Sequence, residues 1–459
     1  MLKLSPRDDA ACLYICRAAE AAGGRAYLVG GCVRDSLLGI VPKDIDVEIY
    51  GLSLEAVEGI LRKKFRIEMV GKSFGVWILK GYNIDVSIPR RERKAGEGHK
   101  AFEIECDPFM SEADACRRRD FTVNSMLCNY LTGEIVDPFG GREDLKKGLL
   151  RHTSERFSED PLRVLRGMQF SARFCMRVAP ETVRLCSEIG WENLAAERVY
   201  EEWKKLILKG VKISFGLEFL RDCGWIKYFP ELAATVGCEQ DPQWHPEGDV
   251  FTHTAHCMDA FARERVGDER EDLIVGLAVL CHDFGKPICT RKGSDGKIHS
   301  YGHDTHGVAP TRSFLSRLTR EKSLIEEVVP LVERHMAILD LWRSNAGDAA
   351  IRRLARKVIR IDRLVRVDSA DRNGRPPVEA GPSPQGIWIS EKAEALRVRD
   401  SAPNPILMGR HLRELGIPPS EKYRELLSAA YEAQLDGVFS DMDSAKIWLH
   451  KMLAQNTEM

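Results

Sequence analysis

The sequence lacks a hydrophobic run long enough to cross a membrane. Its longest clearly apolar stretch, Leu273 to Cys281, is far shorter than the roughly 20 residues that a spanning helix needs. Its 13 cysteines lack Cys-x-x-Cys pairs, which argues against a structural zinc site or a secreted disulfide framework. The first ten residues carry charges where a signal peptide would have an apolar core. We therefore expect a cytoplasmic protein without a membrane partner.

An excess of charge of either sign is also lacking. The chain has 68 basic residues against 69 acidic ones, for a net charge of −1, so composition neither supports nor excludes a nucleic-acid partner. Basic residues nevertheless recur every three or four positions between Arg352 and Arg366, which predicts a basic stripe along one helix. Such a stripe either faces solvent or contacts RNA phosphates.

The length of 459 residues exceeds what one ordinary core accommodates, so two to four domains are expected. Alternating or apolar segments predict strands in the first part, whereas residues 121–128 fit either a strand or a helix. From Pro161 onward, apolar residues recur at helical spacing and strands become rare. The sequence predicts an α+β fold with a small head and a long all-helical body. The predicted strands are Tyr27 to Gly30, Asp44 to Tyr50, Val76 to Lys80 and Ile84 to Ile88.

A glycine pair near the N-terminus precedes a cluster of carboxylates. Gly30 and Gly31 follow the apolar segment Tyr27-Leu28-Val29, and their backbone amides can approach an anion closely because neither residue has a Cβ atom. In the next segment, Asp44-Ile45-Asp46-Val47-Glu48, the period of a strand places the carboxylates on one face. Carboxylates at this spacing are suitable ligands for two Mg²⁺ ions.

Each of these two features alone fits a common alternative, an ordinary glycine turn or a surface strand with solvated aspartates. Their combination favours a site at which a hydroxyl attacks a nucleoside triphosphate in line. Asp85, on the next predicted strand but one, is either a third metal ligand or an exposed aspartate.

Five segments in order along residues 25–210 resemble motifs of the DNA polymerase β superfamily. The closest resemblance is to the bacterial-type (class II) CCA-adding tRNA nucleotidyltransferases and poly(A) polymerases. The first motif is the glycine pair with its carboxylates. The others are Arg118-Arg119-Asp120 with Phe121 to Asn124, Asp137 to Gly141 with Asp144-Leu145, Glu159 to Arg163, and Glu197 to Glu202.

The resemblance implies a role for each motif residue. Asp44 and Asp46 would bind Mg²⁺ and be catalytic. The remaining residues would bind the nucleotide: Gly30, Gly31 and Arg34 the triphosphate, Arg119, Asp120 and Asn124 the ribose side, and Asp160, Arg163 and Arg166 the base.

Asp160 and Pro161 also fit a purely structural explanation. An aspartate followed by proline is typical of a helix start. That explanation does not cover Arg163, which lies three residues after Asp160, near the same helix face. Together the two side chains offer a carboxylate acceptor and a guanidinium donor to the edge of a base.

The segment from Pro89 to Lys100 is polar and contains glycine, so we expect a mobile loop. In CCA-adding enzymes a loop at this place is implicated in the switch from C to A addition, which favours full CCA addition. The segment Val70 to Val76 also resembles the CCA type.

Histidines and carboxylates gather in the second half of the chain. His253, His282, Asp283 and Asp371 resemble the H…HD…D pattern of HD-domain phosphohydrolases. Such a mixture suits Ni²⁺, Mn²⁺, Co²⁺ or Mg²⁺ rather than a closed zinc site. Three outcomes stay open: an active phosphatase or 2′,3′-cyclic phosphodiesterase, a metal site without turnover, or a helical RNA-binding body. We expect His256 and His335 to be neighbours rather than ligands.

The resemblance thus predicts a tRNA nucleotidyltransferase that adds CCA from CTP and ATP, with tRNA as partner and no DNA partner. The alternatives are a poly(A) polymerase, an enzyme adding only CC or only A, and an HD hydrolase whose head docks tRNA. The expected domains are residues 1–140 as nucleotidyltransferase head, 141–235 as helical neck and body, 236–385 as HD domain and 386–459 as helical tail.

Overall fold

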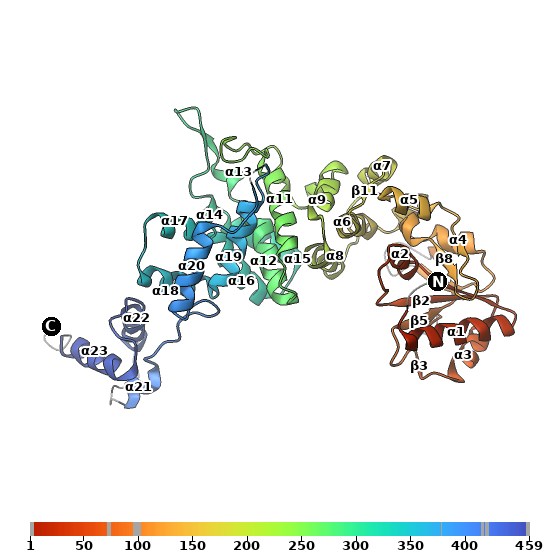
Figure 1. Ribbon diagram of the computed structural model, residues 1–459, viewed down its shortest axis with the longest axis horizontal. Coiled ribbons are helices and arrows are strands. Elements are labelled where there is room, and N and C mark those ends of the chain that lie inside the picture. The colour runs from red at the N-terminus through yellow and green to blue at the C-terminus, as the bar shows by residue number, and fades with distance from the viewer. Residues whose placement is uncertain are drawn as a thin grey trace. The chain divides into compact units, whose positions relative to one another are not determined.

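The computed structural model of the protein describes residues 4–70, 75–94, 102–377, 379–414, 417 and 422–455. The chain divides into two compact units, Met1–Tyr228 and Phe229–Met459 (Figure 1). The first contains a mixed sheet followed by helices, and the second is almost entirely helical. The predicted α+β class is confirmed.

A seven-stranded sheet in the order β3-β4-β5-β2-β1-β8-β9 forms the beginning of the first unit. Its central strand β2 (Ile45–Tyr50) pairs antiparallel with β1 (Arg25–Val29) and parallel with β5 (Ile84–Ser87). Helices α1 (Pro6–Ala21) and α3 (Leu54–Arg62) pack their apolar residues onto one face of the sheet (Figure 1). The remaining elements of this part are α2 (Gly31–Leu37), β3 (Ile67–Val70), β4 (Val76–Leu79), α4 (Glu112–Arg117), β8 (Leu127–Asn129), β9 (Ile135–Val136) and α5 (Gly141–Lys147).

Strand β2 carries the predicted alternation. Ile45, Val47 and Ile49 are buried in the core, whereas Asp46 is exposed on the opposite face. The other face is covered only in part, by α4 residues such as Cys116 against Tyr27 and Tyr50, and Asp46 lies on its uncovered part. The prediction of a half-buried strand at this place is confirmed.

Two sequence predictions need correction or completion. Residues Arg90–Lys94, expected to belong to a mobile loop, form strand β6, which pairs antiparallel with β7 (Phe102–Cys106). Residues 95–100 of that expected loop and most of the segment Val70 to Val76 lie outside the described residues. The ambiguous segment 121–128 contains a 3-10 helix, η1 (Thr122–Asn124), and then the start of β8.

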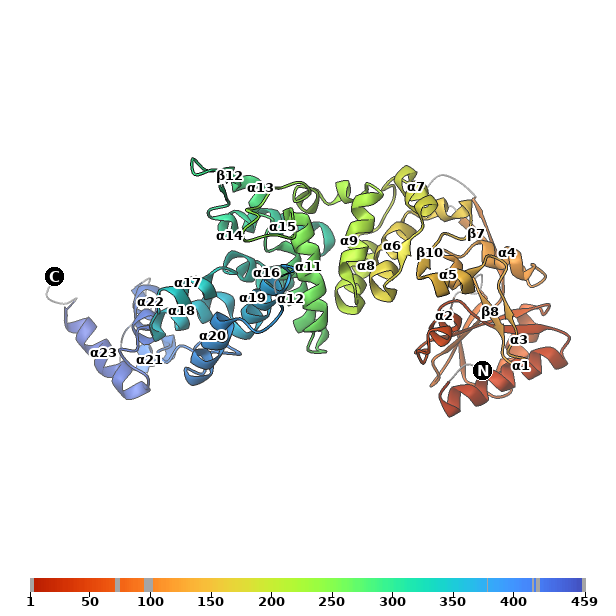
Figure 2. The same cartoon turned by 45° about the horizontal axis from the view of Figure 1, so that its top comes forward.

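Three helices complete the core of the first unit (Figure 2). Helix α6 (Leu162–Phe174) packs against both α8 (Ala196–Lys209) and α9 (Ile213–Asp222). A helix starts here as predicted, but Pro161 is its N-cap and Asp160 lies one residue earlier, where its Oδ1 accepts a hydrogen bond of 3.0 Å from the Leu162 amide. The shorter elements here are β10 (Leu149–Leu150), η2 (Glu155–Glu159), β11 (Arg177–Val178), α7 (Pro180–Glu188) and η3 (Trp225–Tyr228).

The second unit is built around helices α11 (Val250–Arg263), α12 (Glu269–Cys281), α16 (Lys322–Glu333) and α19 (Ile361–Asn373). Among the described residues, no helix combines the length and the apolarity of a membrane span. The other elements are α10 (Pro230–Ala233), α13 (Lys286–Cys289), β12 (Arg291–Lys292), β13 (Ile298–His299), α14 (His303–His306), α15 (Val308–Leu318), α17 (Ala337–Arg343), α18 (Asp348–Val358), α20 (Pro384–Ala395), α21 (Gly409–Glu414), α22 (Lys422–Leu435) and α23 (Met442–Gln455).

The prediction of one basic helix is wrong. The stripe is divided between α18 and α19, because the backbone leaves the helix at Ile359, where φ is +68°. Arg353 pairs with Asp436 at 2.6 Å, and Arg363 pairs with Glu271 at 2.6 Å. These arginines therefore connect helices within the unit.

Gly216 allows α9 to approach α6 closely, and this contact is testable. A Cβ atom at Gly216 would lie 2.5 Å from the Met168 backbone oxygen, which cannot move without disturbing α6. We expect Gly216→Ala to lower the free energy of unfolding by about 1–3 kcal/mol, as overpacking does. The control Gly59→Ala, in α3, meets nothing within 4 Å and should stabilise by up to about 1 kcal/mol. Thermal unfolding followed by circular dichroism compares them, and equal midpoints would contradict the contact.

Candidate active site and metal centre

A hollow of about 530 Å³ in the first unit brings together the catalytic and nucleotide-binding residues nominated from the sequence, except Asp44 and the possible third metal ligand Asp85. It is bounded by the glycine turn after β1, by β2, by η1 and by the start of α6. The nominated residues in its lining are Gly30, Gly31, Arg34, Asp46, Arg119, Asp120, Asn124, Asp160, Arg163 and Arg166.

Gly30 has a backbone conformation that favours glycine, with φ +72° and ψ −126°. A Cβ atom there would lie 2.7 Å from Nη1 of Arg119. The absent side chain thus leaves room for the Arg119 guanidinium beside the turn, and the backbone of the turn borders the hollow directly.

The carboxylates lie on neighbouring parallel strands. Asp46 of β2 is the register partner of Asp85 of β5, so both side chains project from the same face of the sheet. Restricted access to water raises the pKa of the Asp46 carboxyl, and Asp85 and Asp44 act in the same direction while Arg119 opposes them. Partial burial and the charge of Asp44 likewise raise the pKa of Asp85.

A second hollow, of about 390 Å³, lies against the same carboxylates. It shares Asp46, Arg119 and Arg163 with the first and adds Asp85 and Glu48. The Glu48 carboxylate accepts a hydrogen bond of 2.6 Å from the Tyr50 hydroxyl and lies 3.7 Å from Arg119. Glu48 is therefore engaged within the protein. The oxygen donors of Asp44, Asp46 and Asp85 are the kind that Mg²⁺ prefers.

A buried chain of polar side chains connects the glycine turn with α6. Arg34, which is only 4% exposed, donates hydrogen bonds to Asp35 and Asn124. Asn124 donates to Asp120 at 3.0 Å, and Asp120 accepts from Arg166 at 2.8 Å. Burial acts against ionisation of Asp120, but Arg166 and the hydrogen bonds keep the pKa of its carboxyl below the usual value. Each side chain of this hydrogen-bonded series is thus fixed by a partner.

Asp160 and Arg163 both line the hollow, but their polar atoms have partners within the protein. Oδ2 of Asp160 accepts a hydrogen bond of 2.9 Å from Arg198. The Arg163 guanidinium donates to the backbone oxygens of Arg156 at 2.7 Å and Arg118 at 2.8 Å. The expected pair therefore lies at the predicted place, with its donors and acceptors already engaged.

The far wall of the hollow is basic, and most of it was missed by sequence reasoning. Arg173 comes from α6, and Arg198, Lys205 and Lys209 come from α8. The spacing of Lys205 and Lys209 by four residues is a signal that would have placed them on one helix face. Their charges suit the phosphates of a nucleotide or an RNA end.

In the second unit, the four residues of the expected H…HD…D pattern lie together. His253 Nε2 lies 3.1 Å from Asp371 Oδ1 and 3.8 Å from Asp283 Oδ2, and His282 Nε2 lies 3.3 Å from Asp283 Oδ2. His253, His282 and Asp283 are almost completely buried. Although burial acts in the opposite sense, His282 and Lys286 hold the pKa of Asp283 well below its usual range.

Several buried polar atoms of this centre contact other groups only as ion pairs. Oδ2 of Asp283 lies 2.7 Å from Lys286 Nζ and 3.3 Å from His282 Nε2, and Oδ1 lies 3.5 Å from His303 Nε2. Buried polar atoms are normally satisfied, so such atoms in a native site require an explanation. A divalent cation supplies one, since imidazole and carboxylate are suitable ligands for it.

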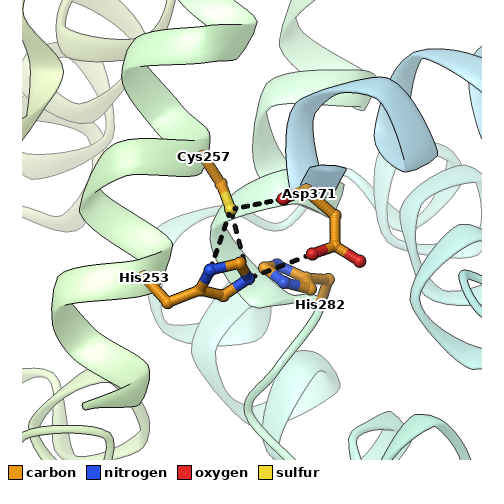
Figure 3. A group of neighbouring side chains, drawn as sticks. All are labelled: His253, Cys257, His282 and Asp371. Atoms are coloured by element: carbon orange, nitrogen blue, oxygen red, sulfur yellow. Dashed lines mark hydrogen bonds and ion pairs between the residues drawn. The ribbon is translucent and has the colours of Figure 1, made fainter. Parts of the chain in front are cut away.

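Three further side chains lie in or beside the centre, and one of them, Cys257, was not singled out from the sequence. Cys257 forms a group of potential ligands with His253, His282 and Asp371 (Figure 3). His303 and His335 form another with Asp283, and their Nε2 atoms lie 3.0 Å apart. Burial and the neighbouring His303 lower the pKa of His335 to about 3, which favours the neutral imidazole that binds metals. The expectation that His335 is a neighbour rather than a ligand stays a prediction.

A cavity of about 650 Å³ opens onto this centre. Asp283, His303, His335 and Asp371 line it, and so does a group of cationic side chains, Lys286, Arg343, Arg372 and Arg375. Trp244 and Tyr301 are exposed aromatic residues in the same lining. Cations and aromatic faces next to metal-type ligands suit a phosphorylated, ring-containing ligand.

Comparison with known proteins agrees with this arrangement. Residues 26–151 match the family described as the poly A polymerase head domain. The multifunctional CCA protein of Nitrosococcus oceani is 33% identical over 370 residues, which cover 78% of this chain and 87% of that protein. The corresponding protein of Laribacter hongkongensis is 35% identical over 79% of this chain and 88% of its own length.

The fold is also similar to that of a solved structure. The CCA-adding enzyme of Bacillus stearothermophilus in complex with CTP has a TM-score of 0.68 and 22% identity, with 99% of each chain covered. The two curated relatives are matched over most of their length at more than 30% identity, and the hollow contains the motif residues in place. The chain therefore belongs to the family of CCA-adding tRNA nucleotidyltransferases.

Proposed function

We propose that the first unit adds CCA to tRNA 3′ ends, using CTP and ATP. The observation that carries this proposal is the single hollow that joins the glycine turn, Asp46 and the start of α6. Phosphate, reacting atoms and base of one nucleotide would thus be held in one place. The two curated relatives support the proposal, because both are named multifunctional CCA proteins.

The reaction would be an in-line attack of the terminal tRNA hydroxyl on the α-phosphate, with pyrophosphate as leaving group. Asp44 and Asp46, with Asp85 beside them, would hold Mg²⁺, which when bound supplies the positive charge that such a transfer needs. Arg119 and the basic wall formed by Arg173, Arg198, Lys205 and Lys209 would bind phosphates. These roles rest on the lining of the two hollows.

Base selection would fall to Asp160 and Arg163. Because Arg198 and two backbone oxygens occupy their polar atoms here, a bound base would exchange these partners for its own edge. The assignment of residues 1–140 to a head, 141–235 to a neck and body, 236–385 to an HD domain and 386–459 to a tail stays a prediction, as does a cytoplasmic location.

A poly(A) polymerase is the principal alternative, since the matched family covers only the head. Three tRNA transcripts, ending before the CCA triplet, after its first C and after its second C, separate the possibilities. With Mg²⁺, CTP and ATP present and one of the two triphosphates labelled, we expect the additions to stop after the final A. An adenosine ladder would establish a poly(A) polymerase, and a halt after CC, or addition of A only, would establish a partial enzyme.

Asp46→Asn tests the catalytic carboxylate. Loss of a ligand to the catalytic cation removes several kcal/mol of charge stabilisation, so we expect nucleotide addition to fall by at least about 10³-fold. The control Glu58→Gln, in α3, changes a half-buried carboxylate that pairs with Arg62 and should leave the rate unchanged. Retention of the rate in Asp46→Asn would rule out the assignment.

Asp160→Ala tests base selection. A good pair of hydrogen bonds to a base edge contributes about 1–3 kcal/mol of discrimination, so we expect the preference for CTP and ATP over UTP and GTP to fall by roughly 10- to 100-fold. Competition among the four triphosphates measures this preference. Arg184→Ala, at an exposed position of α7, is the control, and an unchanged preference in Asp160→Ala would assign Asp160 to helix capping alone.

The second unit supports a second activity, and we propose a metal-dependent phosphohydrolase acting on phosphomonoesters or 2′,3′-cyclic nucleotides. The buried, closely spaced side chains of His282 and Asp283 support a bound cation, which when present supplies an activated water. The cationic lining of the cavity, including Arg372 and Arg375, would bind the phosphate. The alternatives are a metal site without turnover and a purely RNA-binding body.

His282→Ala and Asp46→Asn separate the two activities. Hydrolysis of 2′,3′-cyclic AMP, assayed with Ni²⁺, Mn²⁺, Co²⁺ and Mg²⁺ in turn, should disappear in His282→Ala and persist in Asp46→Asn. Nucleotide addition should show the reverse pattern. His306→Ala, an exposed histidine of α14, is the matched control. Hydrolysis that survives in His282→Ala, or its absence with every metal in the wild type, would contradict the proposed second activity.

A further inference from the structure

Cys257 lies inside the metal centre and has no part in the function proposed above. Its sulfur is 3.3 Å from Nε2 of His253. One ligand atom from each of Cys257, His253, His282 and Asp371 lies within 4.8 Å of all the others. Figure 3 shows the sulfur above the His253 ring and beside Asp371. The sulfur thus occupies a place that a ligand to the same ion would occupy.

The fold holds the cysteine there by two local features. His253 and Cys257 are four residues apart on α11, so they lie on the same face of that helix. Gly374 follows the end of α19, and a Cβ atom at that position would collide with both the side chain and the backbone of Cys257. This close approach brings Asp371 of α19 next to the sulfur.

The hydrogen bonds of the two histidines determine which ring nitrogens face the centre. His253 Nδ1 lies 2.7 Å from Oε1 of Glu247, and His282 Nδ1 lies 2.7 Å from the Val279 backbone oxygen. Both partners are acceptors, so each Nδ1 carries a proton, and each Nε2 is left to bind a metal ion when the ring is in its neutral form. An outer acceptor of this kind is the usual companion of a metal-binding histidine.

These nitrogens lie beside carboxylate oxygens. His253 Nε2 lies 3.1 Å from Asp371 Oδ1, and His282 Nε2 lies 3.3 Å from Asp283 Oδ2. A hydrogen bond from the Cys257 thiol to His253 would explain one contact only. A cation among the four side chains explains all of them, because it accepts electron pairs from both nitrogens, the carboxylate and the sulfur.

We propose that Cys257 is a protein ligand of this site, in addition to His253, His282, Asp283 and Asp371 of the expected pattern. The site would then take a cation that accepts sulfur, such as Zn²⁺ or Co²⁺, in preference to Mg²⁺ or Mn²⁺. On binding, the sulfur–metal bond forms and the thiol proton passes to solvent, without any change of oxidation state. The inference rests on the proposed function only in assuming that the centre binds a metal.

Cobalt is the probe for this inference, since a thiolate bound to Co²⁺ gives a strong near-ultraviolet charge-transfer band. The full-length protein is stripped with a chelator and titrated with Co²⁺, and bound metal is counted after dialysis. We expect the band in the wild type, its loss in Cys257→Ser, and weakening of Co²⁺ binding in that variant by at least about tenfold, the loss caused by removing even an outer partner of a ligand. Cys281→Ser, which removes another fully buried thiol, should keep the band.

A second measurement does not depend on a variant that folds. X-ray absorption of the zinc-loaded wild type should show one sulfur neighbour at about 2.3 Å with nitrogen or oxygen at about 2.0–2.2 Å. Stoichiometric Co²⁺ or Zn²⁺ without a charge-transfer band or a sulfur neighbour would overturn the role of Cys257 and leave the metal centre intact. Failure of the wild type to bind either ion would overturn the metal centre and the inference together.

Discussion

Repulsion between carboxylates held on neighbouring strands is the constraint on which the first unit depends. The parallel register of β2 and β5 places Asp46 beside Asp85, with Asp44 near both. This arrangement costs free energy in an empty site and is stable only because the sheet core beneath fixes both strands. The groups arranged around it, Arg119 above all, supply compensating charge. Such a cluster of carboxylates suits a protein that binds cations. The family assignment also indicates cation binding.

The second unit also holds potential metal donors close together, but its donors are histidines as well as aspartates. Three histidines direct Nε2 atoms toward two aspartates, and Nε2 of a fourth, His335, lies 3.0 Å from that of His303. Backbone oxygens or Glu247 hold Nδ1 of each ring. Since these candidate ligands come from α11, α14, α19 and the ends of α12 and α16, folding of the helices assembles the centre. The orientation of each ring is determined by its outer hydrogen bond before any ion arrives.

Much of the first site follows from the sequence, because its signals are local. The period of a strand predicts that Asp46 projects away from Ile45 and Val47, and Asp160 before Pro161 predicts a helix start. The hydrogen bonds of the Arg163 guanidinium could not be predicted from the sequence, because its partners, the backbone oxygens of Arg118 and Arg156, meet it only in the folded chain. The strand β6 was mistaken for a loop because a polar segment resembles a loop until its partner β7 is known. Cys257 was detectable from its four-residue spacing to His253, whereas His303 and His335 meet only through tertiary packing.

The buried chain from Arg34 through Asn124 and Asp120 to Arg166 has a geometric consequence. One end borders the glycine turn and the other lies on α6, so the chain acts as a strut of fixed length between the two ends of the hollow. The turn and the helix are therefore joined at a set distance before any ligand enters the hollow. The contact of Arg198 with Asp160 lies outside this connection, so it can change without altering that distance.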